Sequence, residues 1–402
     1  MKYAVCIPTY NRPELVPKAV ESVLKDPTNP GFPIFVSSDS DPKYKAKEIE
    51  RLKEIRSNNR SKIYYVDTER SEPYKRQLEK LSGLSREVID ISMNGGSAGA
   101  NRNRLILLSS TYGVDGTIFI DDDMKVEPGF TAYHLMALGN TVSQFILNSK
   151  QFEGTKNKAI CTQSLKEYDF EKKIQVFAPH WLWEDKRQRK LPMVCDDLHD
   201  LGESVQLDGG NLSLTSLVYN EIPFSTTSSE EDWILGLFAK KMLDYLGGII
   251  LMTNHPTTYQ REPEPNSERE KTLKNLEYDT GDVYGDLVFG ELFSIYAHIR
   301  DNLSIPVGKN YAREIVKRFG KEVESFTQSR RLRELLQNSE KELENIIKEY
   351  DFEDTFDAKS MAEKMRKDLY GTGILYQNWS ELTDSAKRVD PIILEEFLLS
   401  NT

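Results

Sequence analysis

The sequence predicts an α/β fold, with a mostly parallel sheet flanked by helices and a helical region at the C-terminal end. Over residues 3–66, short apolar runs alternate with amphipathic segments, which is the pattern of successive β-α-β units. Beyond about residue 263 the apolar runs cease, and Glu, Lys and Arg dominate several helical patterns. We therefore expect two domains, residues 1–262 and residues 263–402, with Pro-Glu-Pro at residues 263–265 as the linker.

The predicted strands share short apolar sequences and lie at residues 3–7, 34–36, 62–66, 118–120 and 247–252. Residues 14–24 carry apolar side chains at helical spacing, and a charged helix is expected at residues 45–57. Because the carboxyl ends of parallel strands meet at one edge of a sheet, the loops at residues 8–13 and 37–41 should lie there beside residues 121–123. The helices predicted in the C-terminal region lie near residues 283–302, 308–325, 328–350 and 358–370.

Three acids follow the predicted strand at residues 118–120: Asp121, Asp122 and Asp123. Adjacent carboxylates repel one another, so such a cluster is unfavourable unless a cation lies beside it. Carboxylate oxygens favour a hard ion such as Mg²⁺ or Mn²⁺, and such an ion would also hold a diphosphate. The structural alternative is a helix N-cap or a solvated turn, in which the same acids need no ligand.

A glycine-rich stretch, residues 94–99, precedes Arg102, Asn103 and Arg104 and an apolar run. Glycines permit a ligand to approach the backbone, and the amide groups at a helix start suit a diphosphate, to which Arg102 or Arg104 would add charge. The stretch lacks the Gly-Lys-Ser/Thr ending of a Walker loop, and its spacing fails the dinucleotide fingerprint. A purely structural helix entrance is the alternative.

Three later segments carry polar residues at the ends of predicted elements. Residues 209–211, Gly-Gly-Asn, lead into a strand and would let a ligand approach the backbone. Glu231 and Asp232 open an amphipathic helix, where acids are also expected simply as favourable partners of the helix dipole. His255 follows the strand at residues 247–252, and a lone histidine in such a place is more often structural than a ligand.

Other polar and aromatic residues favour structural roles. His134, inside an apolar stretch, is expected to pack in the core. The Asp- and His-rich residues 196–200 match no standard metal-site spacing, so we expect a solvated loop there. Residues 180–183, His-Trp-Leu-Trp, would form either a mobile flap over a sugar or an ordinary surface loop.

The composition restricts the class of protein. A formal net charge of −11 over 402 residues argues against a protein that coats nucleic acid or anionic membrane. Three cysteines, Cys6, Cys161 and Cys195, give neither a disulfide framework nor a Cys-x-x-Cys metal pair, so we expect a reducing compartment, the cytoplasm. We expect no signal peptide ahead of the first strand, and the longest apolar run, near residues 246–252, is too short to span a bilayer.

Taken in order, these motifs resemble the GT-A glycosyltransferases, especially the inverting glycosyltransferase family 2. The resemblance covers about residues 1–262, and its most specific parts are Asp-x-Asp at residues 121–123 and Pro-Thr-Tyr-Asn-Arg at residues 8–12. The chain departs from the family in two ways. Its second strand ends in Ser-Ser-Asp in place of an acidic pair, which leaves Asp41 as an alternative to Asp39, and the Gln-x-x-Arg-Trp signature of processive synthases is absent.

The resemblance implies a role for each matching position. Asp232 would be the base that activates the acceptor, with Glu231 beside it. The metal, Mn²⁺ or Mg²⁺, would be held by Asp121, Asp123 and His255. The residues implied for binding the nucleotide sugar are Pro8, Thr9, Tyr10, Arg12, Asp39, Arg102, Asn103, Asp121, Asp122, Gly210 and Asn211.

The activity that the resemblance implies is metal-dependent transfer of a sugar from a nucleotide-diphosphate sugar, with UDP as the expected nucleotide, to an acceptor hydroxyl. Inversion and a non-processive reaction are expected, although GT-A folds host both inversion and retention. Two alternatives stay open. One is a nucleotidyltransferase that makes an NDP-sugar, which would normally carry a glycine-rich loop and a lysine after its first strand. The other is a non-catalytic scaffold, and the C-terminal helices would also suit a contact between copies of the chain.

Overall fold

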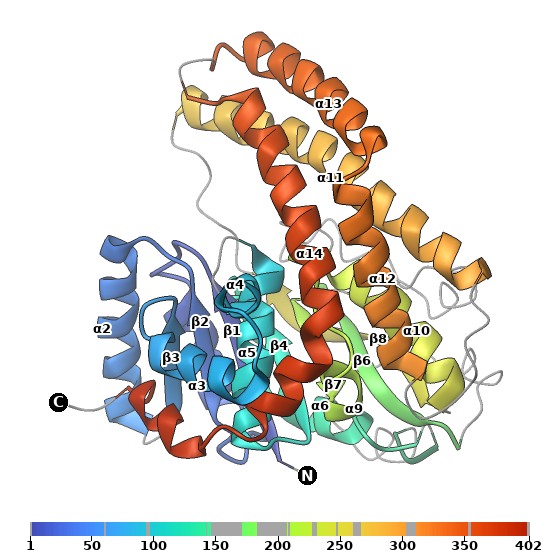
Figure 1. Ribbon diagram of the computed structural model, residues 1–402. Coiled ribbons are helices and arrows are strands. Elements are labelled where there is room, and N and C mark those ends of the chain that lie inside the picture. The colour runs from blue at the N-terminus through green and yellow to red at the C-terminus, as the bar shows by residue number, and fades with distance from the viewer. Residues whose placement is uncertain are drawn as a thin grey trace.

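The computed structural model describes residues 2–59, 62–93, 97–141, 143–145, 171–182, 207, 210–226, 231–246, 248–259, 267–302, 311–352 and 355–399. At its centre is an eight-stranded sheet (Figure 1) with the strand order β3-β2-β1-β4-β7-β6-β8-β5. The strands are β1 (Tyr3–Thr9), β2 (Ile34–Ser38), β3 (Ile63–Asp67), β4 (Gly116–Ile120), β5 (Met124–Val126), β6 (Lys173–Leu182), β7 (Asn211–Thr215) and β8 (Gly248–Tyr259).

The half of the sheet built from β1 to β4 is parallel. β1 pairs with both β2 and β4, and β2 pairs with β3, all in parallel. β7 runs antiparallel to β4 and β6, whereas β6 and β8 are parallel to each other. The predicted α/β fold with a mostly parallel sheet is therefore confirmed. The carboxyl ends of β1, β2 and β4 lie at one edge, and the first residue of β7 joins them there, because Asn211 pairs with Ile120.

Eight helices of the N-terminal region can be described: α1 (Val16–Lys25), α2 (Pro42–Asn59), α3 (Glu72–Ser82), α4 (Arg86–Met93), α5 (Ala98–Tyr112), α6 (Phe130–Ala137), α9 (Ser216–Tyr219) and α10 (Glu231–Leu246). They cover both faces of the sheet, because successive residues of a buried strand point to opposite faces and are apolar on both. In β1, Val5 and Ile7 belong to a core with α1 and α2. Ala4 and Cys6 belong to a second, larger core with α4, α5 and α10.

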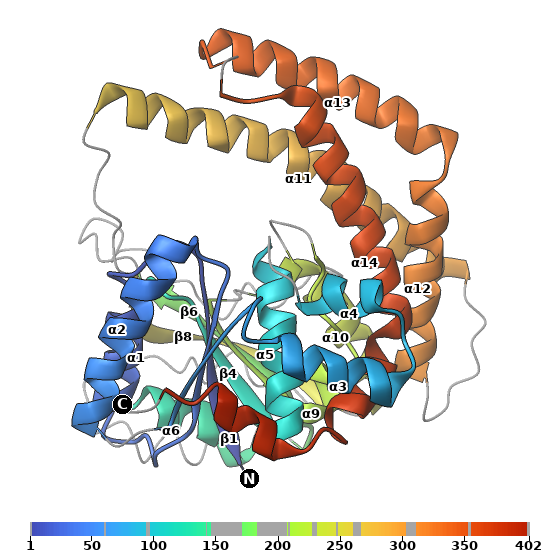
Figure 2. The same cartoon turned by 60° about the vertical axis from the view of Figure 1, so that its left-hand side comes forward.

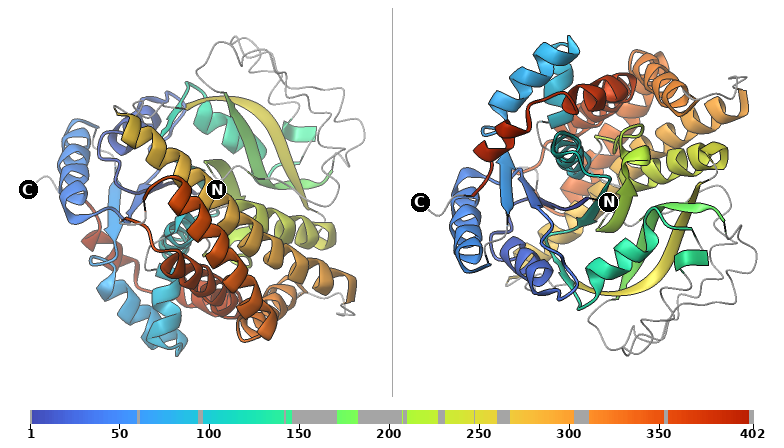
Figure 3. Two further views of the ribbon diagram at one scale, coloured as in Figure 1. Left: turned by 90° about the horizontal axis from the view of Figure 1, so that it is seen from above. Right: turned by 90° about the horizontal axis from the view of Figure 1, so that it is seen from below.

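The C-terminal region is helical, as predicted, with α11 (Glu268–Asn302), α12 (Tyr311–Thr327), α13 (Arg330–Glu349), α14 (Ala358–Ala386) and a short 3₁₀ helix η2 (Pro391–Glu396). In Figure 2, α11 and α13 form an arch above the sheet, and α14 runs down from it to α3, α4 and α5. Views from above and below (Figure 3) place α2, in blue, and β8, in yellow, on opposite sides of the molecule.

The end of the chain returns to the sheet. Leu399 N donates a hydrogen bond to Ile63 O (3.0 Å), and Tyr65 N donates to Phe397 O (2.8 Å). These bonds cover the outer edge of β3, which would otherwise present unpaired backbone groups. The C-terminal helices also contribute to the larger of the two cores, through Trp379 among others. The domain boundary at residue 262 stays a prediction.

Individual expectations have mixed outcomes. His134 is fully buried with Nδ1 3.0 Å from Ser213 Oγ, so its predicted place in the core is confirmed. His255 does not follow its strand but lies within it, because β8 continues to Tyr259; the β-branched threonines after Pro256 favour that extension. Residues 180–182 end β6, so the expectation of a flap or surface loop is wrong for their backbone. Helices α3 and α4 are not among the predicted elements.

Some expectations concern residues outside the described part of the chain, namely residues 94–96, Cys161, Trp183, residues 184–200 and Cys195. Cys6 is buried in the sheet. None of the helices that the structure describes is both long and apolar enough to cross a lipid bilayer.

Candidate active site

The carboxyl edge of the sheet brings the predicted loops together. Thr9 O, at the end of β1, accepts hydrogen bonds from Asp39 N (3.1 Å) and from Asn101 Nδ2 (3.2 Å). At the next strand, Asp121 N donates to Gly210 O (3.1 Å). Backbone groups thus hold the ends of β1, β2 and β4 and the start of β7 in one place, as the parallel topology predicts.

Arg12 binds two of the three acids. Its Nη1 lies 2.9 Å from Asp122 Oδ1 and 2.8 Å from Asp123 Oδ2, and Thr9 Oγ1 donates to Asp122 Oδ2 (2.6 Å). Both acid side chains are buried, whereas that of Arg12 is 35% exposed. Burial raises the pKa of Asp122 to about 6, although Arg12 and Thr9 act to lower it. Asp122 is therefore an acid that holds its proton more strongly than usual.

Arg102 joins the third acid to the start of α10. Its Nη2 donates to Asp121 Oδ1 (2.7 Å), and its Nη1 forms an ion pair with Glu231. The Arg102 side chain is only 5% exposed, and its Cζ lies 5.5 Å from the centroid of the Phe224 ring. Burial alone would lower the pKa of Arg102, but the charges of Asp121 and of the two acids that begin α10 outweigh it and raise that pKa. Arg102 is consequently a permanent buried cation.

Buried polar contacts fix the loop after β2. Arg104 is fully buried, and its Nη2 donates to Asp39 Oδ1 (2.8 Å). Asn11 N donates to Ser40 Oγ (2.6 Å), while Asn11 Oδ1 accepts from Asp41 N (2.7 Å). Asn11 has a φ of 55°, a left-handed conformation that asparagine tolerates better than most residues. These hydrogen bonds therefore hold the loops after β1 and β2 together.

The remaining residues implied for the nucleotide sugar differ in accessibility. Tyr10 is 61% exposed, whereas Pro8 and Asn211 are buried within β1 and β7. Asn103 is also fully buried, and its side-chain amide exchanges two hydrogen bonds of 2.9 Å with the backbone of Phe224. Asn103 therefore supports the site by holding the backbone of Phe224. This role differs from the direct contact with the donor that the resemblance implies.

Glu231 and Asp232 are the first residues of α10, as predicted. Glu231 is 5% exposed and tied to Arg102, whereas Asp232 is half-buried. Since residues 227–230 lie outside the described part of the chain, the N-cap alternative stays a prediction.

The acid cluster obtains its counter-ions from the chain itself. The expectation that a cation lies beside the three acids is met by Arg12 and Arg102, so the acids do not by themselves require a metal. Among the residues that the structure describes, no three His, Cys, Asp or Glu side chains are grouped so as to hold a metal ion. A metal site made of protein ligands alone is therefore not found in that part of the chain.

Two carboxylates nevertheless fit a metal that a substrate also binds. Asp121 and Asp123 are hard oxygen donors, and the side chain of Asp121 is 32% exposed. A Cβ at Gly210 would lie 2.6 Å from Asp121 Oδ2, so a larger residue there would displace this carboxylate. Mg²⁺ is commonly bound by one or two carboxylates, while substrate phosphates supply further oxygens. Asp121 and Asp123 meet that requirement.

Strand register argues against His255 as a further metal ligand. β8 pairs with β5, and Tyr259 lies opposite Met124, the residue after Asp123. His255 is four residues farther along β8, which is roughly 13 Å in an extended strand. The role that the resemblance implies for His255 is therefore corrected: its backbone lies too far along the strand from Asp123.

Some supporting residues carry no signal in the sequence. The sequence predicts Glu48 to be one of several acids on a charged helix, yet its side chain is fully buried. It accepts hydrogen bonds from three hydroxyls, those of Ser38 (2.8 Å), Ser40 (2.6 Å) and Tyr65 (2.8 Å). Only the pairing of β2 with β3 and the packing of α2 bring these groups together, so helical spacing alone does not reveal them.

Comparisons with known proteins give distant structural likenesses. No protein-family model and no curated protein matches this chain. Glucosyl-3-phosphoglycerate synthase from Mycobacterium tuberculosis, in complex with Mn²⁺, UDP and phosphoglyceric acid, matches with a TM-score of 0.36 and 15% identity, over 65% of this chain and 72% of that chain. A mannosyltransferase from Pyrobaculum calidifontis, in complex with GDP-Man and Mn²⁺, matches with a TM-score of 0.40 and 9% identity, over 97% of this chain and 86% of that chain. Likenesses of this degree do not assign an activity.

Proposed function

We propose that this protein is a metal-dependent glycosyltransferase that moves a sugar from a nucleotide-diphosphate sugar to an acceptor hydroxyl. The observation that carries this proposal is the pair of arginines, Arg12 and Arg102, beside the acids at residues 121–123 on the carboxyl edge of the sheet. Guanidinium groups bind phosphate oxygens through paired hydrogen bonds. Nucleotide ligands of α/β sheets bind at this edge.

The loops after β1 and β2 are proposed to receive the nucleoside. The exposed ring of Tyr10 offers a stacking surface for a base, and Asp39, or Asp41 in its place, would accept a hydrogen bond from it. Arg12 is partly exposed and would exchange a carboxylate partner for a donor phosphate. A Mg²⁺ or Mn²⁺ ion held by Asp121 and Asp123 would neutralise the charge of the leaving diphosphate.

Asp232 is proposed as the base that removes the proton from the acceptor hydroxyl. Glu231 is less suited to this role, because accepting a proton would break its buried ion pair with Arg102. Asp232 is more exposed and lies in the same first turn of α10. General-base assistance of this kind contributes roughly 10²–10⁴-fold to the rate.

The finer features follow the same proposal. UDP is the expected nucleotide, and attack of the acceptor oxygen opposite the leaving group would invert the anomeric carbon. A single addition, without processivity, is expected, and the cytoplasm is the proposed location. The region of residues 263–402 would shape the acceptor side or a contact between copies of the chain.

A panel of UDP- and GDP-sugars, incubated with the purified protein with and without Mn²⁺, tests the proposal. The expected result is Mn²⁺-dependent release of nucleoside diphosphate, together with thermal stabilisation by UDP plus Mn²⁺. Asp123→Ala should abolish the Mn²⁺-dependent part of that stabilisation. Asp286→Asn, an exposed acid on α11, is the matched control and should leave it unchanged.

A second incubation, with nucleoside triphosphates and sugar phosphates, separates the alternatives. Release of pyrophosphate from a nucleoside triphosphate and a sugar phosphate would support a nucleotidyltransferase. Binding of UDP without turnover of any donor or acceptor would support a scaffold. UDP affinity that is equal with and without metal would reject the assignment of Asp123.

A further inference from the structure

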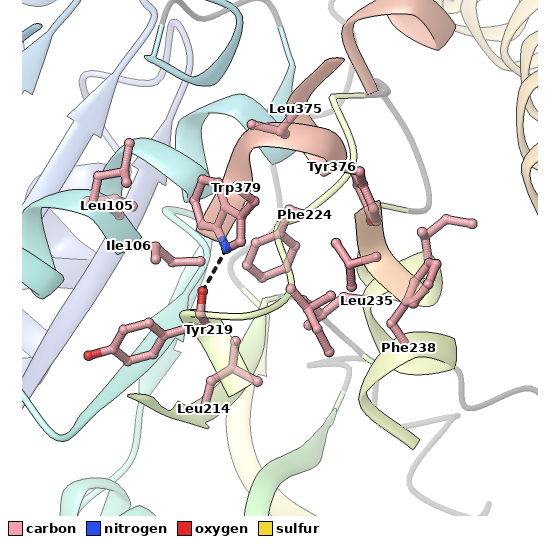
Figure 4. Close-up of a cluster of buried hydrophobic side chains, with 14 of the residues drawn as sticks. Leu105, Ile106, Leu214, Tyr219, Phe224, Leu235, Phe238, Leu375, Tyr376 and Trp379 are labelled. Carbon is pink, nitrogen blue, oxygen red and sulfur yellow. Dashed lines mark hydrogen bonds between the residues drawn. The ribbon is translucent and has the colours of Figure 1, made fainter. Parts of the chain in front are cut away.

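Successive turns of α14 bind one short segment, residues 219–226, which runs from the last residue of α9 toward α10. Trp379 Nε1 donates to Tyr219 O (2.9 Å), and Tyr376 OH donates to Pro223 O (3.2 Å). Figure 4 shows these side chains of α14 against the segment, with the bond between Trp379 and Tyr219 as a dashed line. Trp379 and Tyr376 are essentially fully buried.

Two threonines of α14, one on each side of Tyr376 and Trp379 along the helix, also form hydrogen bonds with the segment. Thr383 Oγ1 donates to Asn220 O (2.9 Å), and Thr226 N donates to Thr372 Oγ1 (3.2 Å). The four α14 side chains recur every three or four residues, so they lie on one face of the helix. Because their partners are backbone groups, α14 determines the path of the segment's backbone in addition to covering its apolar side chains.

The same segment supports the arginine at the centre of the site. The Phe224 ring lies against the Arg102 guanidinium, and the Asn103 amide holds the backbone of Phe224 through two bonds of 2.9 Å. A Cβ on Gly99, in the first turn of α5, would overlap the carbonyl oxygen of Ser225. The segment is therefore in direct contact with the helix that carries Arg102, and a shift of the segment must move that arginine or open the packing beneath it.

We propose that Thr372 and Tyr376 are positioning residues, which hold residues 219–226 in place and thereby fix Arg102 and the acids that it binds. This inference rests on the function proposed above for the site. It makes the C-terminal helix a structural component of the active site. Neither residue has a sequence signal for such a role, since both lie in a long amphipathic helix.

The test removes single hydroxyls. Tyr376→Phe and Thr372→Val delete the bonds to the segment while keeping nearly the same side-chain volume. In the ligand-free protein, both variants should raise the rate of amide hydrogen exchange over residues 219–226 and in the first turn of α10. With a donor sugar, the kcat for release of nucleoside diphosphate should fall about tenfold, because small misplacements of catalytic groups are costly, while KM for the donor stays nearly constant. Thr372→Ser should restore both readouts.

Tyr350→Phe is the matched control, because Tyr350 OH donates to Asp279 (2.6 Å) within the C-terminal helices. It should leave exchange over residues 219–226 and kcat unchanged. Exchange at the wild-type rate in both Tyr376→Phe and Thr372→Val, or equal effects in Tyr350→Phe, would overturn the inference. Amide hydrogen exchange does not depend on turnover. If the wild-type protein releases no nucleotide, the proposed function is rejected, and the exchange rates still decide whether Thr372 and Tyr376 hold residues 219–226.

Discussion

Arg12 and Arg102 both pair with carboxylates of the loop after β4, but in different surroundings. Arg12 holds Asp122 and Asp123 with 35% of its side chain exposed. Arg102 holds Asp121 and Glu231 with only 5% exposed. Water reaches the guanidinium of the first arginine, whereas the second guanidinium is enclosed by protein together with Glu231.

This difference in exposure indicates that the two arginines have different functions in the same site. Breaking a buried ion pair leaves an uncompensated charge in a low dielectric, and the loss of stability is smaller where water can reach that charge. Arg102 therefore belongs to the framework that connects β4, α5 and α10. Arg12 is the arginine whose partners are able to change when a ligand arrives.

The largest expected effect tests this division directly. Arg102→Gln should lower the free energy of unfolding by about 4 kcal/mol, because it leaves the buried carboxylate of Glu231 without its cation. Arg12→Gln should cost less, about 2 kcal/mol, because Asp122 and Asp123 are buried but water can enter the space that the partly exposed guanidinium leaves. Denaturant unfolding measures both values, and Arg318→Gln, which removes an exposed pair with Glu322, is the control for loss of a surface charge. Equal losses for Arg12 and Arg102 would remove the distinction.

The second test compares the two acids of α10. Asp232→Asn should reduce sugar transfer by roughly 10², equivalent to about 2.7 kcal/mol, with nearly unchanged UDP binding. Its stability should fall by no more than about 1 kcal/mol, the contribution of an acid at a helix start. Glu231→Gln should show the opposite balance, a larger loss of stability and a smaller loss of turnover, because it breaks the pair with Arg102. Transfer by Asp232→Asn within a few-fold of wild type would return Asp232 to the role of a helix-capping acid.

The third test uses the pKa of Asp122, which burial raises to about 6. The folded protein then holds a proton that the unfolded chain, with an Asp pKa of about 3.9, releases. This contribution to stability is fully present below about pH 4 and is lost as the pH rises through 6. The difference in unfolding free energy between wild type and Asp122→Asn should therefore grow by about 2 kcal/mol, in favour of wild type, as the pH falls from 7 to 4. A difference that is constant with pH would show that folding leaves the pKa of Asp122 unchanged.

The smallest expected effect concerns the metal. Since Arg12 occupies a carboxylate that is also a proposed metal ligand, Arg12→Gln should tighten Mn²⁺ binding in the absence of nucleotide by about fivefold, near 1 kcal/mol. Titration calorimetry with Mn²⁺ alone measures this. Arg12→Lys, which keeps the charge, should change it less, and Arg51→Gln, which removes an exposed pair with Glu14, should not change it. Weaker Mn²⁺ binding in Arg12→Gln would mean that Arg12 supports the metal site instead of competing for it.

Much of the site was predictable because it depends on strand ends. An apolar run that stops at Pro8 and another that stops at Asp121 locate two loops, and parallel pairing brings them to one edge. The partners of those loops were not predictable. Arg12 and Asp122 are 110 residues apart, and spacing along the chain holds no information about which arginine meets which acid. The same reason explains the error over His255, whose distance from Asp123 depends on the register of β8 against β5.

The sequence by itself determined the alternation of strands and helices, the helical C-terminal region and the presence of acids, glycines and arginines at the strand ends. These follow from local patterns of apolar and polar residues, which each segment carries alone. Only the tertiary structure decided that Arg12 and Arg102 neutralise the acid cluster, that Asn103 binds the backbone of Phe224 and that α14 holds residues 219–226. Such contacts depend on the packing of elements from distant parts of the chain, where burial and geometry select one partner among several with the same charge.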